Sequence, residues 1–246
     1  MESTDTTVQP RWFATTRWSL VLRAGDDSPE ARQALEQLCL LYWYPLFTFA
    51  RCIGHTREEA EDLTQGFFAQ LLARRSLQTI SRVGGRFRSF LLVAFKHFVA
   101  NQSARNRTRK RGGDAPHLAL DVPACGELID AALNDRLTPD RLFDRAWGLV
   151  VLGRAQVALR TEYDNAGRRP VFEKLMQFLP GETANESQID AARATGMTEG
   201  AFRMELHRFK QRLARAIRDE VAETIGPNGV VDQEVRSLLA AFRNSV

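Results

Sequence analysis

Apolar residues recur at intervals of three and four positions along most of the chain, and this spacing constrains the fold more than any other feature. Such a stripe is typical of an α-helix that buries one face, because about 3.6 residues complete each turn. The alternating patterns that indicate half-buried strands are absent from the sequence, and runs of β-branched residues are short. The spacing therefore predicts an all-α protein.

The size and composition of the chain limit the class of protein. Its 246 residues are enough for one large domain or two small ones, and a hydrophobic content of 44% is enough to fill their cores. The net charge of +4 is only mildly basic. The distribution of charge along the chain is therefore more informative than its sum.

The sequence shows no sign of secretion or membrane insertion. Its N-terminal segment lacks the apolar core of a signal peptide, and no apolar run approaches the roughly 18 residues that a membrane span needs. Cys39, Cys52 and Cys125 are far apart, and the histidines do not have metal-ligand spacing. We expect a cytoplasmic protein with reduced cysteines, no metal or other cofactor, and no membrane contact.

The helical segments fall into two groups with a segment of different composition between them. This segment is rich in glycine, proline and acidic residues, which favours a linker. Thr138 and Pro139, directly after it, are typical of an N-cap and the first position of a helix. The expected organisation is a disordered tail over residues 1–15, a helical domain over 16–113, a linker over 114–137, a second helical domain over 138–225 and a helical extension over 226–246.

The segment TREEAEDLTQGFFAQLL, which begins at Thr56, predicts a helix with one acidic face. Thr56 and Glu59 have the spacing of a capping box. The acidic face suits docking to a basic partner, and the alternative is a face that contacts only water. Paired carboxylates also serve general acid–base catalysis, but the sequence contains no nucleophile elbow, P-loop or dinucleotide-binding turn, so we do not expect an enzyme.

The segment GRFRSFLLVAFKHFVANQSARNRTRKRGG predicts a long helix that becomes basic toward its end. We expect its phenylalanines to pack in the core rather than to stack on unpaired bases. Clusters of basic residues bind backbone phosphates by releasing counterions, and the alternative is a solvated surface. The basic run that we expect to contact nucleic acid comprises Lys96, Arg105, Arg107, Arg109, Lys110 and Arg111.

The segment DAARATGMTEGAFRMELHRFKQRL predicts two helices joined by a tight turn. Gly196 supplies the positive φ that such a turn needs, Ala192 allows close approach of the helices, and Thr198 can cap the second one. This second helix has a basic face, as in a helix-turn-helix that reads DNA, and the alternative is an ordinary pair of core helices.

These features occur in the order found in one family. The motifs EEAEDLTQGFF and GMTEGAFRMELHRFKQRL, with a Gly-Arg-Phe loop and a basic helix between them, resemble bacterial RNA polymerase sigma factors of the extracytoplasmic-function (ECF) type. The resemblance covers region 2 over about residues 16–113 and region 4 over about residues 138–223. The chain departs from the family pattern at Phe90, where tryptophan is usual, and at Thr195, where leucine is usual.

The resemblance implies roles for individual residues. Those that match the family's core-polymerase docking helix are Glu61, Asp62 and Gln65. Those that match or extend the surface of region 2 for the minus-ten element are Arg82, Arg86, Arg88, Lys96, His97, Asn101 and the basic run that ends at Arg111. Those that match the helix of region 4 for the minus-thirty-five element are Thr198, Glu199, Arg203, His207 and Arg208.

The resemblance thus implies a non-enzymatic sigma factor that directs core RNA polymerase to promoter DNA and helps to open the duplex. An anti-sigma factor is a further partner that the family suggests. The first alternative is a stand-alone helix-turn-helix regulator that does not join polymerase, and the second is a helical adaptor with no role on DNA. A helical enzyme acting on nucleic acid ranks below both.

Overall fold

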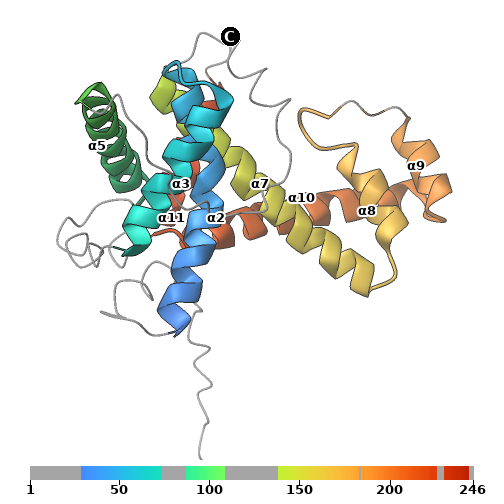
Figure 1. Cartoon of the computed structure of the whole chain (residues 1–246). Coiled ribbons are helices and arrows are strands. Elements are labelled where there is room, and N and C mark those ends of the chain that lie inside the picture. The colour runs from blue at the N-terminus through green and yellow to red at the C-terminus, as the bar shows by residue number, and fades with distance from the viewer. Residues whose placement is uncertain are drawn as a thin grey trace, which may run out of the picture.

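The computed structural model describes residues 29–73, 87–108, 138–182, 184, 186–225 and 230–243. Every regular element within these ranges is an α-helix, which confirms the prediction of an all-α fold (Figure 1). The helices, in chain order, are α2 (Pro29–Cys52), α3 (Arg57–Ala73), α5 (Phe87–Thr108), α7 (Pro139–Asn165), α8 (Arg169–Met176), α9 (Gln188–Ala194), α10 (Glu199–Ala222) and α11 (Val231–Arg243).

The central helix α2 continues through Pro45, although a proline in this position usually bends or interrupts a helix. A proline inside a helix removes one backbone hydrogen bond and costs about 3 kcal/mol. All ten residues from Leu41 to Ala50 are buried, because neighbouring helices cover α2 on every side. Burial of this segment outweighs the local penalty, so the helix stays continuous.

The first hydrophobic core surrounds α2 and is rich in aromatic side chains. Tyr42 lies at its centre, with Phe87 of α5 edge-on at 5.2 Å and Trp147 of α7 stacked at 6.4 Å between ring centroids. Aromatic pairs in such geometry contribute about 0.5–1.5 kcal/mol each beyond the area that they bury. These contacts join α7 to the helices that precede residue 109.

The second hydrophobic core lies between α8, α9, α10 and the C-terminal half of α7. Tyr163, Phe172 and Phe209 form a triangle of rings whose centroids are 5.7–5.9 Å apart. A short turn separates α7 from α8, where Gly167 has a φ of +66° and Pro170 lies in the first turn of α8. This core fixes the position of α10 against its neighbours.

The two cores are joined because α7 and α10 run from one to the other (Figure 1). The helix α11 packs with the first core through Leu238, although it is the last helix in the sequence. The first core therefore contains residues from the expected first domain, over 16–113, together with residues of α7, α10 and α11. The expected tail over residues 1–15 and the linker over residues 114–137 lie outside the described residues, so the two-domain organisation remains a prediction.

Candidate nucleic-acid interface

The acidic helix α3 begins with the predicted capping box. The backbone amide of Glu59 donates to Thr56 Oγ1 at 3.2 Å, and the amide of Thr56 donates to Glu59 Oε2 at 2.9 Å. The second of these bonds lowers the pKa of Glu59, because it favours the ionised carboxylate. The capping box therefore orders the first turn of the helix that carries the predicted docking residues.

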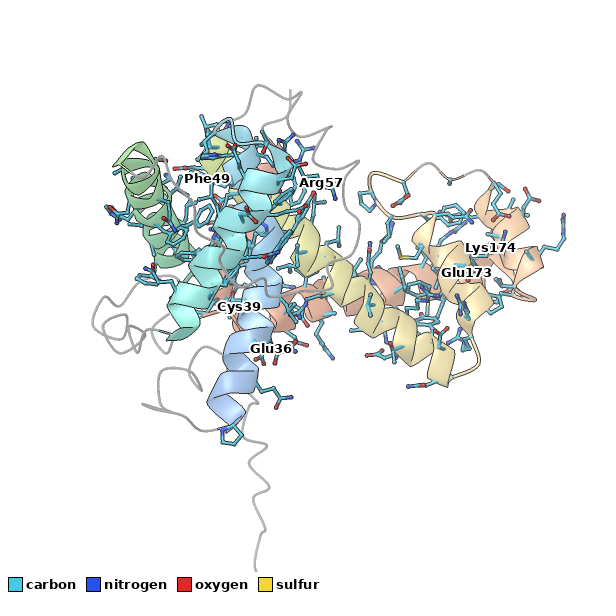
Figure 2. The ribbon with its side chains drawn as sticks, in the orientation of Figure 1. Glu36, Cys39, Phe49, Arg57, Glu173 and Lys174 are labelled. Atoms are coloured by element: carbon cyan, nitrogen blue, oxygen red, sulfur yellow. The ribbon has the colours of Figure 1, made fainter. Side chains whose placement is uncertain are left out.

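The predicted docking residues of α3 lie on its solvent side. Asp62 is exposed, and Glu61 and Gln65 are half-buried. Arg57, which Figure 2 labels at the start of the helix, pairs with Glu61 at 3.0 Å. The opposite side of α3 packs into the first core, with Ala60, Thr64, Phe67, Phe68 and Leu71 buried. The acidic face is thus held outward by the packing of the apolar face.

The helix α5 buries its aromatic stripe and exposes part of its polar face. Phe87, Phe95 and Phe98 are buried, which confirms the prediction that they belong to the core. His97 and Asn101 are exposed on the other side of the helix. Lys96 is exposed in part, and its Nζ lies 2.6 Å from Asp140 Oδ1 of α7.

Lys96 also lies over the ring of Phe49, with its Nζ 5.5 Å from the ring centroid, and Figure 2 places Phe49 near the end of α2.

Several other residues that the sequence predicts to contact DNA cannot be placed from the described part of the chain. Those outside the described residues are Arg82, Arg86, Arg109, Lys110 and Arg111, and the side chains of Arg105 and Arg107 are not described either.

Arg88, which the resemblance assigned to a DNA contact, is buried in this structure. Only 5% of its surface is exposed. Its Nη1 lies 3.1 Å from Asp144 Oδ1 of α7, and its Nε lies 3.2 Å from Glu234 Oε1 of α11. The guanidinium also lies 4.6 Å from the ring centroid of Trp147. In this arrangement the side chain cannot reach DNA, because two carboxylates and an aromatic ring surround it.

The helices α9 and α10 meet at the predicted turn. Gly196 has a φ of +68°, a conformation that L side chains rarely adopt. Thr198 is the N-cap of α10, and its Oγ1 accepts a hydrogen bond from the amide of Ala201 at 3.3 Å. Ala192 is buried between the helices. These three details agree with the predictions made from the sequence.

The five residues predicted to read DNA from α10 are all exposed. Glu199 and Arg203 form an ion pair one turn apart, so this arginine is already neutralised in part. His207 contacts Gln211 at 2.9 Å. Arg208 makes no ion pair with any residue in the described part of the chain. Of the two arginines among these five residues, Arg208 is therefore the one whose charge no described carboxylate neutralises.

Arg208 belongs to an arginine-lined groove of about 390 Å³ that the sequence analysis missed. We call it the arginine groove; its lining consists of Arg168, Glu205, Arg208, Gln211, Arg212 and Arg215. Arg208, Arg212 and Arg215 are spaced four and three positions apart, so they share one face of α10. This spacing was visible in the sequence, but Arg168 comes from the turn before α8, and only the fold brings it to this face.

A buried tyrosine organises the arginine groove. Tyr163 Oη donates a hydrogen bond to Glu205 Oε1 at 2.8 Å, and Arg168 Nη1 lies 3.1 Å from the same oxygen. The guanidinium carbons of Arg168 and Arg212 lie 5.5 and 5.7 Å from the centroid of the Tyr163 ring. Burial and the nearby Glu205 raise the pKa of Tyr163 to about 12, so its hydroxyl remains a donor.

The arginine groove is a suitable site for phosphate. Four guanidinium groups line it, and two carboxylates offset part of their charge: Glu205 in the lining, beside Arg168, and Glu162, whose Oε2 lies 3.9 Å from Arg212 Nη2. Guanidinium groups bind phosphate oxygens through paired N–H donors, and stacking on Tyr163 reduces the freedom that Arg168 and Arg212 lose on binding. The arrangement therefore favours a polyanion over a neutral ligand.

Comparison of the chain with protein-family models, with curated proteins and with solved structures found no match. Among the helices that the structure describes, none has the length and apolar character required to cross a membrane. The functional interpretation therefore depends on the residues and surfaces of this chain.

Proposed function

We propose that the chain is a sigma factor of the ECF type, which acts in the cytoplasm and directs core RNA polymerase to promoter DNA. In this function the chain is a specificity subunit and not an enzyme. The observation that carries the proposal is the presence of two exposed surfaces of opposite charge on one chain. They are the acidic face of α3 and the arginine-rich face of α10.

The acidic face of α3 supports docking to polymerase. Residues 57–65 contain four carboxylates and one arginine, and the capping box holds the first turn in place. Such a rigid face of one sign increases the rate of encounter with a basic partner and restricts its orientation. Glu61, Asp62 and Gln65 are the residues that we assign to this contact.

The pair of helices α9 and α10 supports promoter recognition. The turn at Gly196 and the cap at Thr198 leave the N-terminal half of α10 exposed, which suits insertion into the major groove. Arg203 and His207 are then available for base edges. The arginine groove is placed further along the same helix, where it suits a backbone phosphate beside the groove of the DNA.

The test of the proposal is association with bacterial core RNA polymerase, measured by size-exclusion chromatography. Wild type is compared with an Asp62→Arg/Gln65→Ala variant, which reverses one charge and removes one amide on the solvent side of α3. The matched control is Glu173→Arg, which reverses an exposed carboxylate on α8, at the opposite end of the molecule from α3 (Figures 1 and 2).

We expect wild type and the control to elute with polymerase and the α3 variant to elute alone. If all three proteins bind equally, the assignment of α3 is wrong. If wild type does not bind, the proposal of a sigma factor is wrong.

The second candidate function is a stand-alone DNA-binding regulator, which the arginine-rich face of α10 favours by itself. Such a protein binds a specific duplex tightly in the absence of polymerase. A sigma factor instead needs polymerase for its tightest promoter complex, because two modest DNA contacts are then combined on one surface. Gel-shift assays with and without core polymerase separate these functions. An adaptor without a role on DNA would show only weak binding that has no sequence preference and disappears as salt increases.

A further inference from the structure

The C-terminal helix α11 docks on the first core through one apolar side. Leu238 is 6% exposed, whereas the next residue, Leu239, is 51% exposed. Phe242 rests directly on α7 at Gly148, where an added Cβ would lie only 2.6 Å from Phe242 Cε2. The nearest atoms to that Cβ all belong to Phe242 and Leu238, so the absence of a side chain at Gly148 allows α11 to pack closely against α7.

The docked helix also inserts a carboxylate into the core. Glu234 is 4% exposed, and its Oε1 lies 3.2 Å from Arg88 Nε. Asp144 of α7 holds the same guanidinium through Nη1 at 3.1 Å. A buried carboxylate is costly unless it is paired, so Glu234 and Arg88 depend on each other for burial.

Carboxylates of α7 and α11 pair with the basic residues of α5 through the same N–H groups that would bind phosphates. Arg88 holds a carboxylate oxygen at two sides of its guanidinium, and the same donors pair with backbone phosphates in nucleic-acid complexes. Lys96, two turns further along α5, is held by Asp140 at 2.6 Å. Two of the cations that we assign to nucleic acid are therefore already engaged by carboxylates of the same chain.

We infer that α11 is an internal competitor for nucleic acid on α5. In the free protein, Glu234 occupies the Nε side of Arg88 as a substitute for a phosphate, and release of α11 opens that side to DNA while Asp144 still holds Nη1. The inference rests on the part of the proposed function in which α5 contacts DNA, and it does not depend on binding to polymerase. A protein of this kind binds DNA weakly until α11 is displaced.

Release of α11 requires little other rearrangement. Its packing involves α7, α10 and the start of α5, whereas the central aromatic cluster of Tyr42, Phe87 and Trp147 is formed by residues of α2, α5 and α7. A single helix of 13 residues that packs through one side can open at a lower free energy than the whole protein. The apparent affinity for DNA then equals the intrinsic affinity multiplied by the fraction of molecules in which α11 is released.

The test compares two neighbouring leucines of α11 in the full-length chain. Leu238→Asp places a charge on the docked side, and Leu239→Asp places the same charge on the exposed side. Binding is measured by fluorescence anisotropy with a labelled fork of duplex and single-stranded DNA of random sequence. We expect Leu238→Asp to bind at least about tenfold more tightly than wild type, and Leu239→Asp to bind within about twofold of it.

A second variant reaches the same state from α7. Gly148→Leu places a side chain in the space that the Phe242 ring occupies. Leucine is compatible with a helix, so the variant displaces α11 without adding charge. We expect the same gain in affinity, and addition of Arg88→Gln to either variant should remove most of it. Equal binding by wild type and Gly148→Leu, with circular dichroism that shows a folded protein, would falsify the inference.

Polymerase association separates this inference from the proposed function. If Gly148→Leu binds DNA more tightly but wild type fails to bind core polymerase, the competitor is established and the sigma-factor proposal is wrong. If wild type binds polymerase and neither variant gains affinity for DNA, the sigma-factor proposal survives and α11 is only a structural helix.

Discussion

Removal of the buried guanidinium of Arg88 should be among the most destabilising single changes in this protein. The Arg88→Met variant keeps a long apolar side chain against Trp147 but leaves Glu234 buried without its cation. Breaking a buried ion pair by removing one partner costs about 3–5 kcal/mol. Methionine restores part of the lost packing, so we expect a loss of about 3 kcal/mol in the free energy of unfolding.

The double variant Arg88→Met/Glu234→Met tests the reason for this loss. An apolar pair of similar volume often replaces a buried ion pair at little or no cost, and Asp144 is exposed enough to be hydrated. The double variant should therefore lie within about 1 kcal/mol of wild type, which gives a coupling of at least about 2 kcal/mol. Urea unfolding followed by circular dichroism measures all the stabilities needed for the cycle.

The matched control is Lys96→Met, which removes the other cation of α5 that pairs with α7. The side chains of Lys96 and Asp140 are 42% and 57% exposed, so water screens this pair. Its loss should cost only about 0–1 kcal/mol. An Arg88→Met variant as stable as Lys96→Met, or a double variant no more stable than Arg88→Met, would show that Glu234 is not a buried partner of Arg88.

Three further predictions concern the ends of helices and the arginine groove. Thr198→Ala should lower stability by about 1 kcal/mol in urea unfolding, because α10 loses its N-cap oxygen, and an unchanged midpoint would refute this role. The lowered pKa of Glu59 means that its capping box stabilises the fold above the usual glutamate pKa and loses this effect as the pH falls through the folded-state pKa. The melting temperatures of wild type and Glu59→Gln should thus differ at neutral pH and converge in strong acid, and a constant difference would contradict the assignment. Arg215→Gln should reduce the slope of log K against log salt for duplex DNA by about 0.9, whereas Arg193→Gln on α9 should leave it unchanged, and equal slopes would exclude a phosphate contact in the groove.

Features set by neighbours in the sequence were predicted well. The capping box of Thr56 and Glu59, the turn at Gly196 and the cap at Thr198 each depend on residues within four positions of one another. The core role of Phe95 likewise follows from its position in a helical stripe. Such features need no knowledge of the tertiary fold, because their geometry is that of a single helix end or face.

Features set by distant residues were missed. The helix α2 passes through Pro45 because burial by other helices offsets a local penalty that the sequence makes visible. The burial of Arg88 depends on Asp144 and Glu234, which are 56 and 146 positions away along the chain. Arg168 joins the arginine groove by the same kind of long-range packing. The sequence shows which residues are basic, but it does not show which of them are already paired with a carboxylate from a distant part of the chain.

The most direct test of the central proposal is transcription in vitro by bacterial core RNA polymerase on a library of genomic fragments, with and without the purified chain. Sequencing of the 5′ ends of the transcripts identifies the start sites. The proposal predicts new start sites that appear only when the chain is added and that share two common upstream elements. An unchanged set of start sites, with a chain that is folded and present in excess over polymerase, would contradict it.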